Sequence, residues 1–397
     1  MKPAQRSNGA SLTIVIKIGT TSICDEVSHF PILSNLSGLV ETVLKLKSLH
    51  HRVIIVTSAA VGTGLRRLNI ATKPSGLAAR QAVAAVGQGR LMALYDDLFG
   101  QFNQPVAQIL LTKNDLSDRS QYLNAVSCLD ELLQMDVVPI VNENDTISTQ
   151  GIRFGDNDTL AAVTAGMAKA DYLFLLTDVD CLYTDNPRTN PDAKPVQVCE
   201  DIGKLRDQVS VASGGSALGT GGMATKLIAA ELATAAGVTT VITHGSKPGR
   251  IFEIIDEKPS ATPLHTRFIA KNNPMIDRKW WILHGLHTAG TIYVDQGAAK
   301  AVVAQGLRSN LFAAGIVDVQ GPFNIQQAVN ICLRLNGQDI VIGKGLVNYS
   351  SSEISRIKGH NSTDFTNILG YINADCVVHR DNLVRIVEEE QVTTSAS

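Results

Sequence analysis

The sequence carries no marked excess of either charge. Its 397 residues include 35 Lys and Arg against 37 Asp and Glu, which gives a formal net charge of −2. This balance argues against a general electrostatic attraction to nucleic acid or to an anionic membrane. Hydrophobic residues make up 44% and charged residues 18%, so the composition is that of a globular protein with room for two or three domains.

The six cysteines are scattered, and none forms a C-x-x-C pair. The sequence therefore predicts neither a zinc ribbon nor a disulfide framework. No apolar run is long enough to span a bilayer, and residues 1–10 lack the apolar core of a secretory signal. We expect a reduced, soluble, cytoplasmic protein with no membrane partner.

A P-loop is also absent, because no G-x-x-x-x-G-K-[ST] string occurs. Residues 219–224 fit the dinucleotide fingerprint G-x-G-x-x-A, but a poor strand precedes them and the strand after them, 239–243, carries no acid. What is present is a glycine-rich run, 213–226, which ends in Thr-Lys just before a helical pattern. Little side-chain bulk, a helix N-terminus and an ammonium group favour phosphate binding. A flexible loop without a ligand is the alternative.

The first two-thirds of the chain alternate short apolar runs with helical patterns. The runs, typical of buried parallel strands, are 12–18, 53–57, 106–111, 137–141, 172–177 and 240–243. The helical patterns between them are 36–50, 78–99, 119–135, 159–169 and 223–236. This alternation predicts an α/β fold with a mostly parallel sheet covered by helices on both faces.

The pattern changes in the last third, where proline, charge and a Trp-Trp pair interrupt the periodicity. We predict a first domain over 1–275, a linker over 276–289 and a flexible tail over 386–397. Between linker and tail, residues 290–385 show short strands around one helix, which predicts a small, mainly β domain.

Polar side chains follow several predicted strands at the carboxyl ends, where α/β sheets bind ligands. Lys17 ends the first strand beside a hydroxyl-rich turn and suits phosphate neutralisation, although a snorkelling lysine is the alternative. Ser58 opens the small-residue turn SAAVGTG, and the polar run 142–145 follows the fourth strand. The turn FGDND, 154–158, opens a helix that its acids could simply cap. With the Thr-Asp pair 177–178, these features favour phosphoryl transfer from a nucleotide.

Seven motifs cover the first domain in a distinctive order: VIKIGTTS, TSAAVGTG, AAVGQ, NENDT, FGDNDTLAA, LLTDVDCLYTDNP and GTGGMATK. In order and spacing they resemble the glutamate 5-kinases, a family of the amino acid kinase superfamily. Residues 291–323 look like the PUA domain that many of these kinases carry. The resemblance implies the amino acid kinase fold and ATP-dependent phosphorylation of the γ-carboxylate of L-glutamate, the first step toward proline.

The resemblance also implies roles for individual residues. Lys17 and Lys226 are expected to flank the transferred phosphoryl group as catalytic residues, with Asp158 orienting both. No general base is needed, because the accepting carboxylate is ionised at neutral pH. The residues expected to hold glutamate are Ser58, Asp145 and Asn157. Those expected to line the ATP site are Lys17, Thr177, Asp178, Thr220, Gly221, Gly222, Met223, Ala224, Thr225 and Lys226.

The cofactors and partners implied are few. ATP is the co-substrate, and Mg²⁺ is expected to arrive on the nucleotide, because the sequence shows no dedicated carboxylate cage. Proline is expected as an inhibitor, a glutamyl phosphate reductase as a separate protein, and a second copy of the chain in a homo-oligomer. Basic residues are spread thinly along the PUA-like segment, so RNA binding is not expected and a role in assembly or regulation is favoured.

Two rival functions remain open at this level. One is a kinase of the same fold acting on aspartate, carbamate or UMP, against which the pair NENDT and FGDND argues. The other is an RNA-binding scaffold with a vestigial kinase domain, against which retention of both lysines and Asp158 argues.

One position departs from the family pattern, because Ala59 stands where these kinases usually have glycine. A positive φ there would cost about 1 kcal/mol and shift the substrate loop, whereas a negative φ would be harmless.

Overall fold

The computed structural model describes residues 11–112, 115–116, 118–148, 157–185, 190, 192–203, 205, 222–256, 262–271, 277–303, 309–335 and 337–387. The chain divides into two compact units, Met1–Met275 and Ile276–Ser397. Within the described ranges, no helix is both long enough and apolar enough to cross a membrane.

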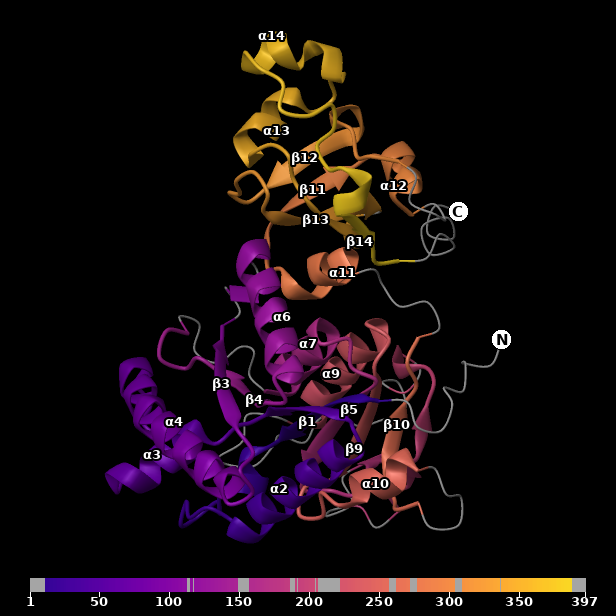
Figure 1. Ribbon diagram of the computed structural model, residues 1–397. Helices are drawn as coiled ribbons and strands as arrows, with labels where there is room; N and C mark the ends of the chain where they lie inside the picture. The colour runs from indigo at the N-terminus through magenta and orange to yellow at the C-terminus, as the bar shows by residue number, and fades with distance from the viewer. Residues whose placement is uncertain are drawn as a thin grey trace. The chain divides into compact units, whose positions relative to one another are not determined.

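The first unit is built on an eight-stranded sheet in the order β3-β4-β2-β1-β5-β9-β10-β8 (Figure 1). Its strands are β1 Thr13–Ile18, β2 Arg52–Val56, β3 Val106–Leu111, β4 Val138–Glu143, β5 Tyr172–Thr177, β8 Val198–Cys199, β9 Thr239–His244 and β10 Thr266–Phe268. All pairs from β3 to β9 are parallel, and only β10 runs antiparallel to its neighbour β9. The predicted mostly parallel sheet is therefore confirmed. The sequence did not reveal β8 and β10, because two or three residues are too few to show an apolar run.

Helices cover both faces of this sheet, as predicted. Figure 1 shows α2 and α10 on one face and α6, α7 and α9 on the other. The helices of the first unit include α1 Thr20–Ile23, α2 Leu33–Ser48, α3 Ala60–Leu68, α4 Leu77–Gly100, α6 Arg119–Gln134, α7 Asn157–Met167, α9 Met223–Ala235 and α10 Arg250–Ile255. One core joins α2, α4 and α10 to the strands, because each places buried apolar side chains at helical spacing against the sheet.

The strand order also shows where a ligand site belongs. From β1 the chain continues to β2 on one side, whereas from β5 it continues to β9 on the other. Adjacent strands whose connections leave in opposite directions form a topological switch point, and ligands bind there beyond the carboxyl ends. Lys17 lies at that end of β1 and Thr177 ends β5.

The turn predicted over SAAVGTG is wrong beyond its first two residues, because helix α3 begins at Ala60. Its small residues serve helix packing instead. A Cβ on Gly64 would lie 1.9 Å from the carbonyl oxygen of Val83 in α4. A Cβ on Gly87 of α4 would lie 1.8 Å from the carbonyl oxygen of Ala60. Glycine at both positions lets the two helix backbones approach more closely than any side chain would allow.

Ala59 precedes α3 in the left-handed conformation, with φ of 79° and ψ of 10°. Of the two alternatives considered from the sequence, a positive and a negative φ, the positive φ is therefore present. An alanine there costs about 1 kcal/mol relative to an unstrained backbone. This conformation turns the backbone directly after Ser58, where α3 begins.

The second unit contains a small sheet in the order β12-β11-β13-β14-β15, which confirms the predicted mainly β domain. Its elements include β11 Thr288–Val294, α12 Gln296–Val303, β12 Ile316–Gln320, β13 Ala328–Leu335, β14 Gln338–Leu346, α13 Ser351–Ile357, α14 Phe365–Leu369 and β15 Leu383–Arg385. Helix α11, Asp277–Trp280, and a π-helical turn, Trp281–Gly285, occupy most of the predicted linker. Both tryptophans are buried, which explains why an apolar Trp-Trp pair occurs there.

Several basic side chains of the second unit are engaged within it. The ammonium group of Lys344 is buried and donates to the carbonyl oxygens of Leu283 and Leu286 at 2.9 and 2.5 Å. Arg334 pairs with Asp339 at 2.7 Å, and Lys358 contacts Asp318 at 3.2 Å. These contacts leave less positive charge for an external phosphate backbone than the sequence count alone indicates.

Candidate functional site

Two buried lysines meet one buried aspartate at the switch point of the sheet. Lys17 Nζ lies 2.5 Å from Asp158 Oδ1, and Lys226 Nζ lies 3.1 Å from Asp158 Oδ2. The lysine side chains are 7% and 8% exposed, and that of Asp158 is fully buried. The structure thus brings together the three residues predicted as catalytic.

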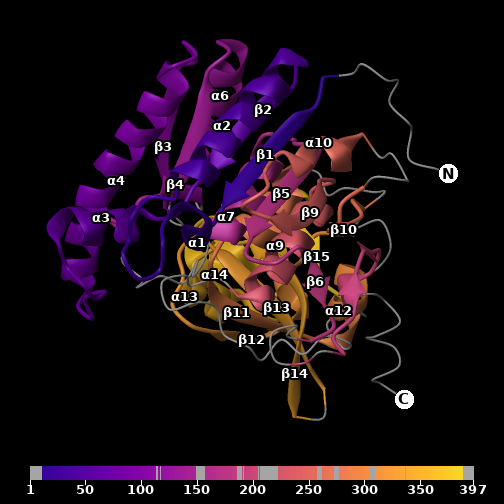
Figure 2. The same cartoon turned by 90° about the horizontal axis from the view of Figure 1, so that it is seen from below.

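Each member of this cluster comes from a different element. Lys17 is the next-to-last residue of β1, Asp158 lies in the first turn of α7, and Lys226 lies in the first turn of α9. Figure 2 shows α1, α7 and α9 grouped close to β1 and β5. Gly222 precedes α9 in an extended conformation, and no side chain caps that helix end. The helix N-terminus therefore adds positive potential to that of the lysines.

The cluster places two ammonium groups around one carboxylate, and all three groups are largely removed from water. Ammonium groups and a helix N-terminus both attract anions such as phosphate. The arrangement therefore suits an anionic ligand.

Thr225 ties the start of α9 to the same carboxylate. Its hydroxyl lies 2.7 Å from the carbonyl oxygen of Gly222 and 3.3 Å from Asp158 Oδ2. Gly222 is the N-cap of α9, and Met223 and Ala224 are the first two residues of the helix. Thr220 and Gly221, also predicted for the ATP site, lie outside the described residues.

Next to the charged cluster lies a chain of neutral amides. The side-chain nitrogen of Asn157 lies 2.7 Å from the carbonyl oxygen of Thr57, 2.9 Å from Ser58 Oγ and 3.0 Å from Asn142 Oδ1. The nitrogen of Asn142 in turn donates to Gln88 Oε1 at 2.7 Å. Ser58 and Asn157, both predicted for glutamate, are thus in direct contact.

Asp145 lies in the turn after β4, three residues beyond Asn142. Burial, assisted by the nearby Glu143 carboxylate, raises its pKa to about 6, while Lys73 opposes the shift. Among the described residues, Asp145 shares no hydrogen bond with Ser58 or Asn157. A partly buried carboxylate of this kind suits a ligand ammonium group, which would hold it in the charged form.

Thr177 ends β5, the strand beside β1, and Asp178 follows it directly. The Thr177 hydroxyl donates to Asp178 Oδ1 at 3.1 Å. Gly245, after β9, approaches this region so closely that a Cβ there would lie 2.3 Å from Ser22 Oγ and 3.3 Å from the carbonyl oxygen of Thr177. The segments that follow β1 and β9 therefore lie close to Thr177 at the carboxyl end of β5.

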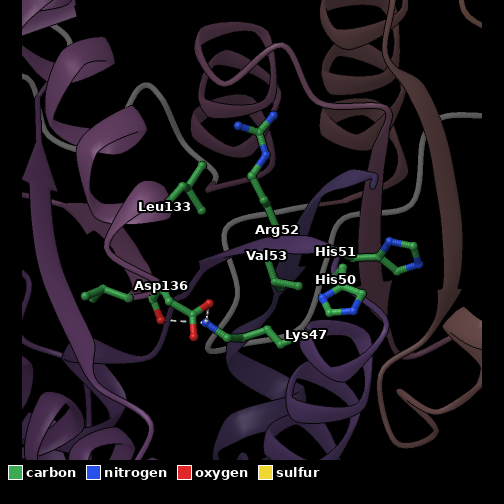
Figure 3. A pocket seen from close by; sticks show the side chains of 8 residues that line it. Lys47, His50, His51, Arg52, Val53, Leu133 and Asp136 are labelled. Carbon is green, nitrogen blue, oxygen red and sulfur yellow. Dashed lines mark hydrogen bonds and ion pairs between the residues drawn. The ribbon is translucent and has the colours of Figure 1, made fainter. Parts of the chain in front are cut away.

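A cavity of about 330 Å³ lies elsewhere in the first unit (Figure 3). It is lined by residues where β2 and β4 begin, so it lies at the opposite edge of the sheet from Lys17. Figure 3 shows the Lys47 ammonium directed at Asp136, whose carboxylate and carbonyl oxygens it contacts at 2.7 and 2.6 Å. Its position excludes it from the chemistry at the switch point.

Three residues of the site had no assigned role in the sequence: Thr57, Gln88 and Asn142. Asn142 is the next-to-last residue of β4 and begins the polar run 142–145, and Gln88 ends the motif AAVGQ. No local signal marks Gln88 as functional, because its contact with Asn142 joins residues 54 positions apart.

Known families match both parts of the chain. The amino acid kinase family matches residues 12–244, and the PUA domain matches residues 290–369. A protein of Schizosaccharomyces pombe called "Probable glutamate 5-kinase" is 53% identical over 392 residues, covering 97% of this chain and 96% of that protein. A "Glutamate 5-kinase" of Rippkaea orientalis is 49% identical over 371 residues, covering 94% and 98%. The chain therefore belongs to the amino acid kinase family and, within it, to the glutamate 5-kinases, and it carries a C-terminal PUA domain.

Proposed function

We propose that the protein transfers the γ-phosphoryl group of ATP to the γ-carboxylate of L-glutamate, forming glutamyl 5-phosphate for proline biosynthesis. The observation that carries the proposal is the cluster of Lys17, Asp158 and Lys226 beside a neutral amide chain at the switch point. Full-length similarity to proteins called glutamate 5-kinase supports the substrate assignment.

In this proposal the two lysines neutralise charge on the phosphoryl group as it moves. Phosphoryl transfer depends mainly on positioning and charge stabilisation. Lys17 and Lys226 are held by the two oxygens of one carboxylate, so Asp158 fixes their separation before substrates bind. The glutamate γ-carboxylate attacks directly, since it is already ionised at neutral pH and has no proton to lose.

Glutamate is proposed to bind against Ser58, Asp145 and Asn157. The Asp145 carboxylate pairs with the α-ammonium group, which counteracts the raised pKa of this acid. Ser58 and Asn157 complete the recognition with one hydroxyl and one amide, in direct contact with each other.

ATP is proposed to lie between Thr177 and Asp178 on one side and the start of α9 on the other, with Thr220 and Gly221 contributing. Mg²⁺ arrives with the nucleotide. Phosphate oxygens and water are proposed to supply most of its ligands.

Four further properties rest on the family resemblance alone. We propose that proline inhibits the enzyme, that a separate reductase consumes the product, that the chain forms a homo-oligomer and that it works in the cytoplasm.

The test is to trap the labile acyl phosphate with hydroxylamine. We expect hydroxamate formation that requires both ATP and L-glutamate. ATP consumption is measured in parallel with glutamate, aspartate, carbamate and UMP, because phosphorylated UMP is not an acyl phosphate and forms no hydroxamate. Absence of glutamate hydroxamate with the wild-type protein would overturn the proposal, as would a clear preference for one of the other acceptors. Proline added to the same assay measures inhibition.

A further inference from the structure

The side-chain amides of Gln88, Asn142 and Asn157 form a chain of hydrogen bonds. Backbone groups beside this chain determine which atom of each amide donates and which accepts. The backbone N–H of Glu143 donates to Asn142 Oδ1 at 2.9 Å, so this oxygen is identified by a group that can only donate. The other Asn142 atom, Nδ2, must then face Gln88, which therefore presents its oxygen, Oε1. The backbone carbonyl of Thr57 can only accept, which identifies the Asn157 atom beside it as nitrogen.

This direction decides what the amino acid substrate meets. The Asn157 nitrogen has three protein oxygens within hydrogen-bond distance for its two hydrogens. Asn157 therefore has only its oxygen to offer to a ligand, and an amide oxygen accepts from an ammonium group. Ser58 Oγ accepts from Asn157, which leaves the hydroxyl hydrogen free to donate to a carboxylate.

We propose that Gln88 is a positioning residue for the amino acid substrate, acting through Asn142. By accepting from Asn142, Gln88 keeps the Asn142 oxygen turned toward Asn157. This directs the Asn157 oxygen to the substrate ammonium group and the Ser58 hydroxyl to a substrate carboxylate. The inference rests on the proposed function. It identifies the ammonium group of the substrate as the group by which the protein selects an amino acid.

The packing of α3 against α4 explains why Gln88 can do this. Gly87 allows α4 to touch the Ala60 backbone, since a Cβ there would lie 1.8 Å from the Ala60 carbonyl oxygen and 2.5 Å from the Gly64 nitrogen. The next residue, Gln88, is thereby brought to Asn142, which is 2% exposed. The motif AAVGQ thus has a structural explanation. Gly87 allows the close approach of α4 to α3, and Gln88 supplies the hydrogen-bond acceptor for Asn142.

Burial makes the acceptor hard to replace. Without Gln88 Oε1, the Asn142 amide would lose its acceptor in a place with little access to water, and an unpaired buried donor is costly. The Asn142 side chain would relieve this cost by rotating, which would withdraw its oxygen from Asn157. The Nε2 atom of Gln88 is buried and has no hydrogen-bond partner among the described residues, so only the oxygen carries the role.

The experiment compares variants that keep or remove this oxygen. Gln88→Met removes the acceptor at similar volume, whereas Gln88→Glu keeps it. For Gln88→Met we expect the KM for glutamate to rise at least tenfold with the KM for ATP changed less than twofold. Gln88→Glu should stay within threefold of wild type. Gln101→Met, at an exposed glutamine just beyond α4, is the matched control and should resemble wild type.

A second readout separates positioning from a merely structural role. Glutarate lacks the ammonium group, so the ratio of kcat/KM for glutamate over glutarate measures ammonium recognition. We expect this ratio to fall at least fivefold in Gln88→Met and to be retained in Gln88→Glu. An unchanged ratio and KM in Gln88→Met, or equal damage from both substitutions, would overturn the inference.

Two provisions keep the test decisive. If Gln88→Met does not fold, Gln88→Leu takes its place with the same expected result. If the wild-type protein forms no glutamate hydroxamate, the proposed function has failed, and crystals of the Gln88→Met protein still test the amide chain. There we expect the Asn142 side chain to leave Asn157, and an unmoved Asn142 would count against the role of Gln88.

Discussion

Asn157 and Asp158 are consecutive residues in the first turn of α7, yet they belong to networks of opposite character. Asp158 is a buried anion held between two ammonium groups. Asn157 is a neutral amide whose nitrogen faces three oxygens of the protein. One helix end therefore positions a charged network toward the phosphate and a neutral network toward the amino acid.

The two networks differ in the ligand groups that they suit. The charged network places two ammonium groups around one carboxylate, which suits the negative charge of a phosphate. The nitrogens of Asn142 and Asn157 already have acceptors within the protein. Losing a lysine should therefore impair catalysis and spare the fold, whereas changes in the amide chain should alter substrate recognition.

The largest expected effect comes from the charged network. Lys226→Met should lower kcat by about 10²–10³, roughly 3–4 kcal/mol, by analogy with losing one donor to a transition-state charge. The KM for glutamate should change little, because the amide chain is intact. The melting temperature should change little, since the contact between Lys17 and Asp158 is retained. Steady-state kinetics and thermal unfolding measure these effects.

Asp158→Asn is the matched contrast, because it removes the carboxylate that both lysines contact. Breaking a buried ion pair in this way costs about 3–5 kcal/mol of folding free energy. Denaturant unfolding should place the Asp158→Asn protein well below Lys226→Met in stability. Equal stability of the two variants would contradict the role of Asp158 as the carboxylate shared by both lysines.

An intermediate effect is expected from pH on the glutamate side. Burial raises the pKa of Asp145 to about 6, so its carboxylate is anionic above that pH and neutral below it. At saturating ATP, kcat/KM for glutamate should therefore fall about tenfold per pH unit below this value, since kcat/KM reports the ATP-bound enzyme before glutamate binds. Asp145→Asn should be impaired at neutral pH and should lack this dependence. A parallel decline in both proteins would show that another group titrates.

The smallest expected effect concerns Ala59. Replacing it with glycine relieves about 1 kcal/mol of left-handed strain, which is offset by about 0.8 kcal/mol for a lost buried methyl group and by about 0.5–1 kcal/mol of glycine entropy. The net change in unfolding free energy should be within about 1 kcal/mol. The KM for glutamate should change less than twofold, because alanine already has the conformation that glycine would adopt. A large drop in KM for Ala59→Gly would mean that the loop is distorted in this chain.

Much of the architecture follows from the sequence, because strand and helix patterns are local. The predicted strand over 172–177 matches β5, and the predicted helix over 223–236 differs from α9 by one residue. The helix α3 was missed because small residues and glycines indicate a turn when the partner helix is unknown. Only the packing of Gly64 and Gly87 shows that these glycines serve a contact between helices.

The sequence by itself determined the α/β class, the family and the residues that carry charge. The tertiary structure decided which of them meet. Asp158 and Lys226 are 68 positions apart, and Gln88 and Asn142 are 54 apart, so no local pattern contains either contact. The direction of the amide chain also required the fold, because an amide can turn either way until fixed backbone donors and acceptors surround it.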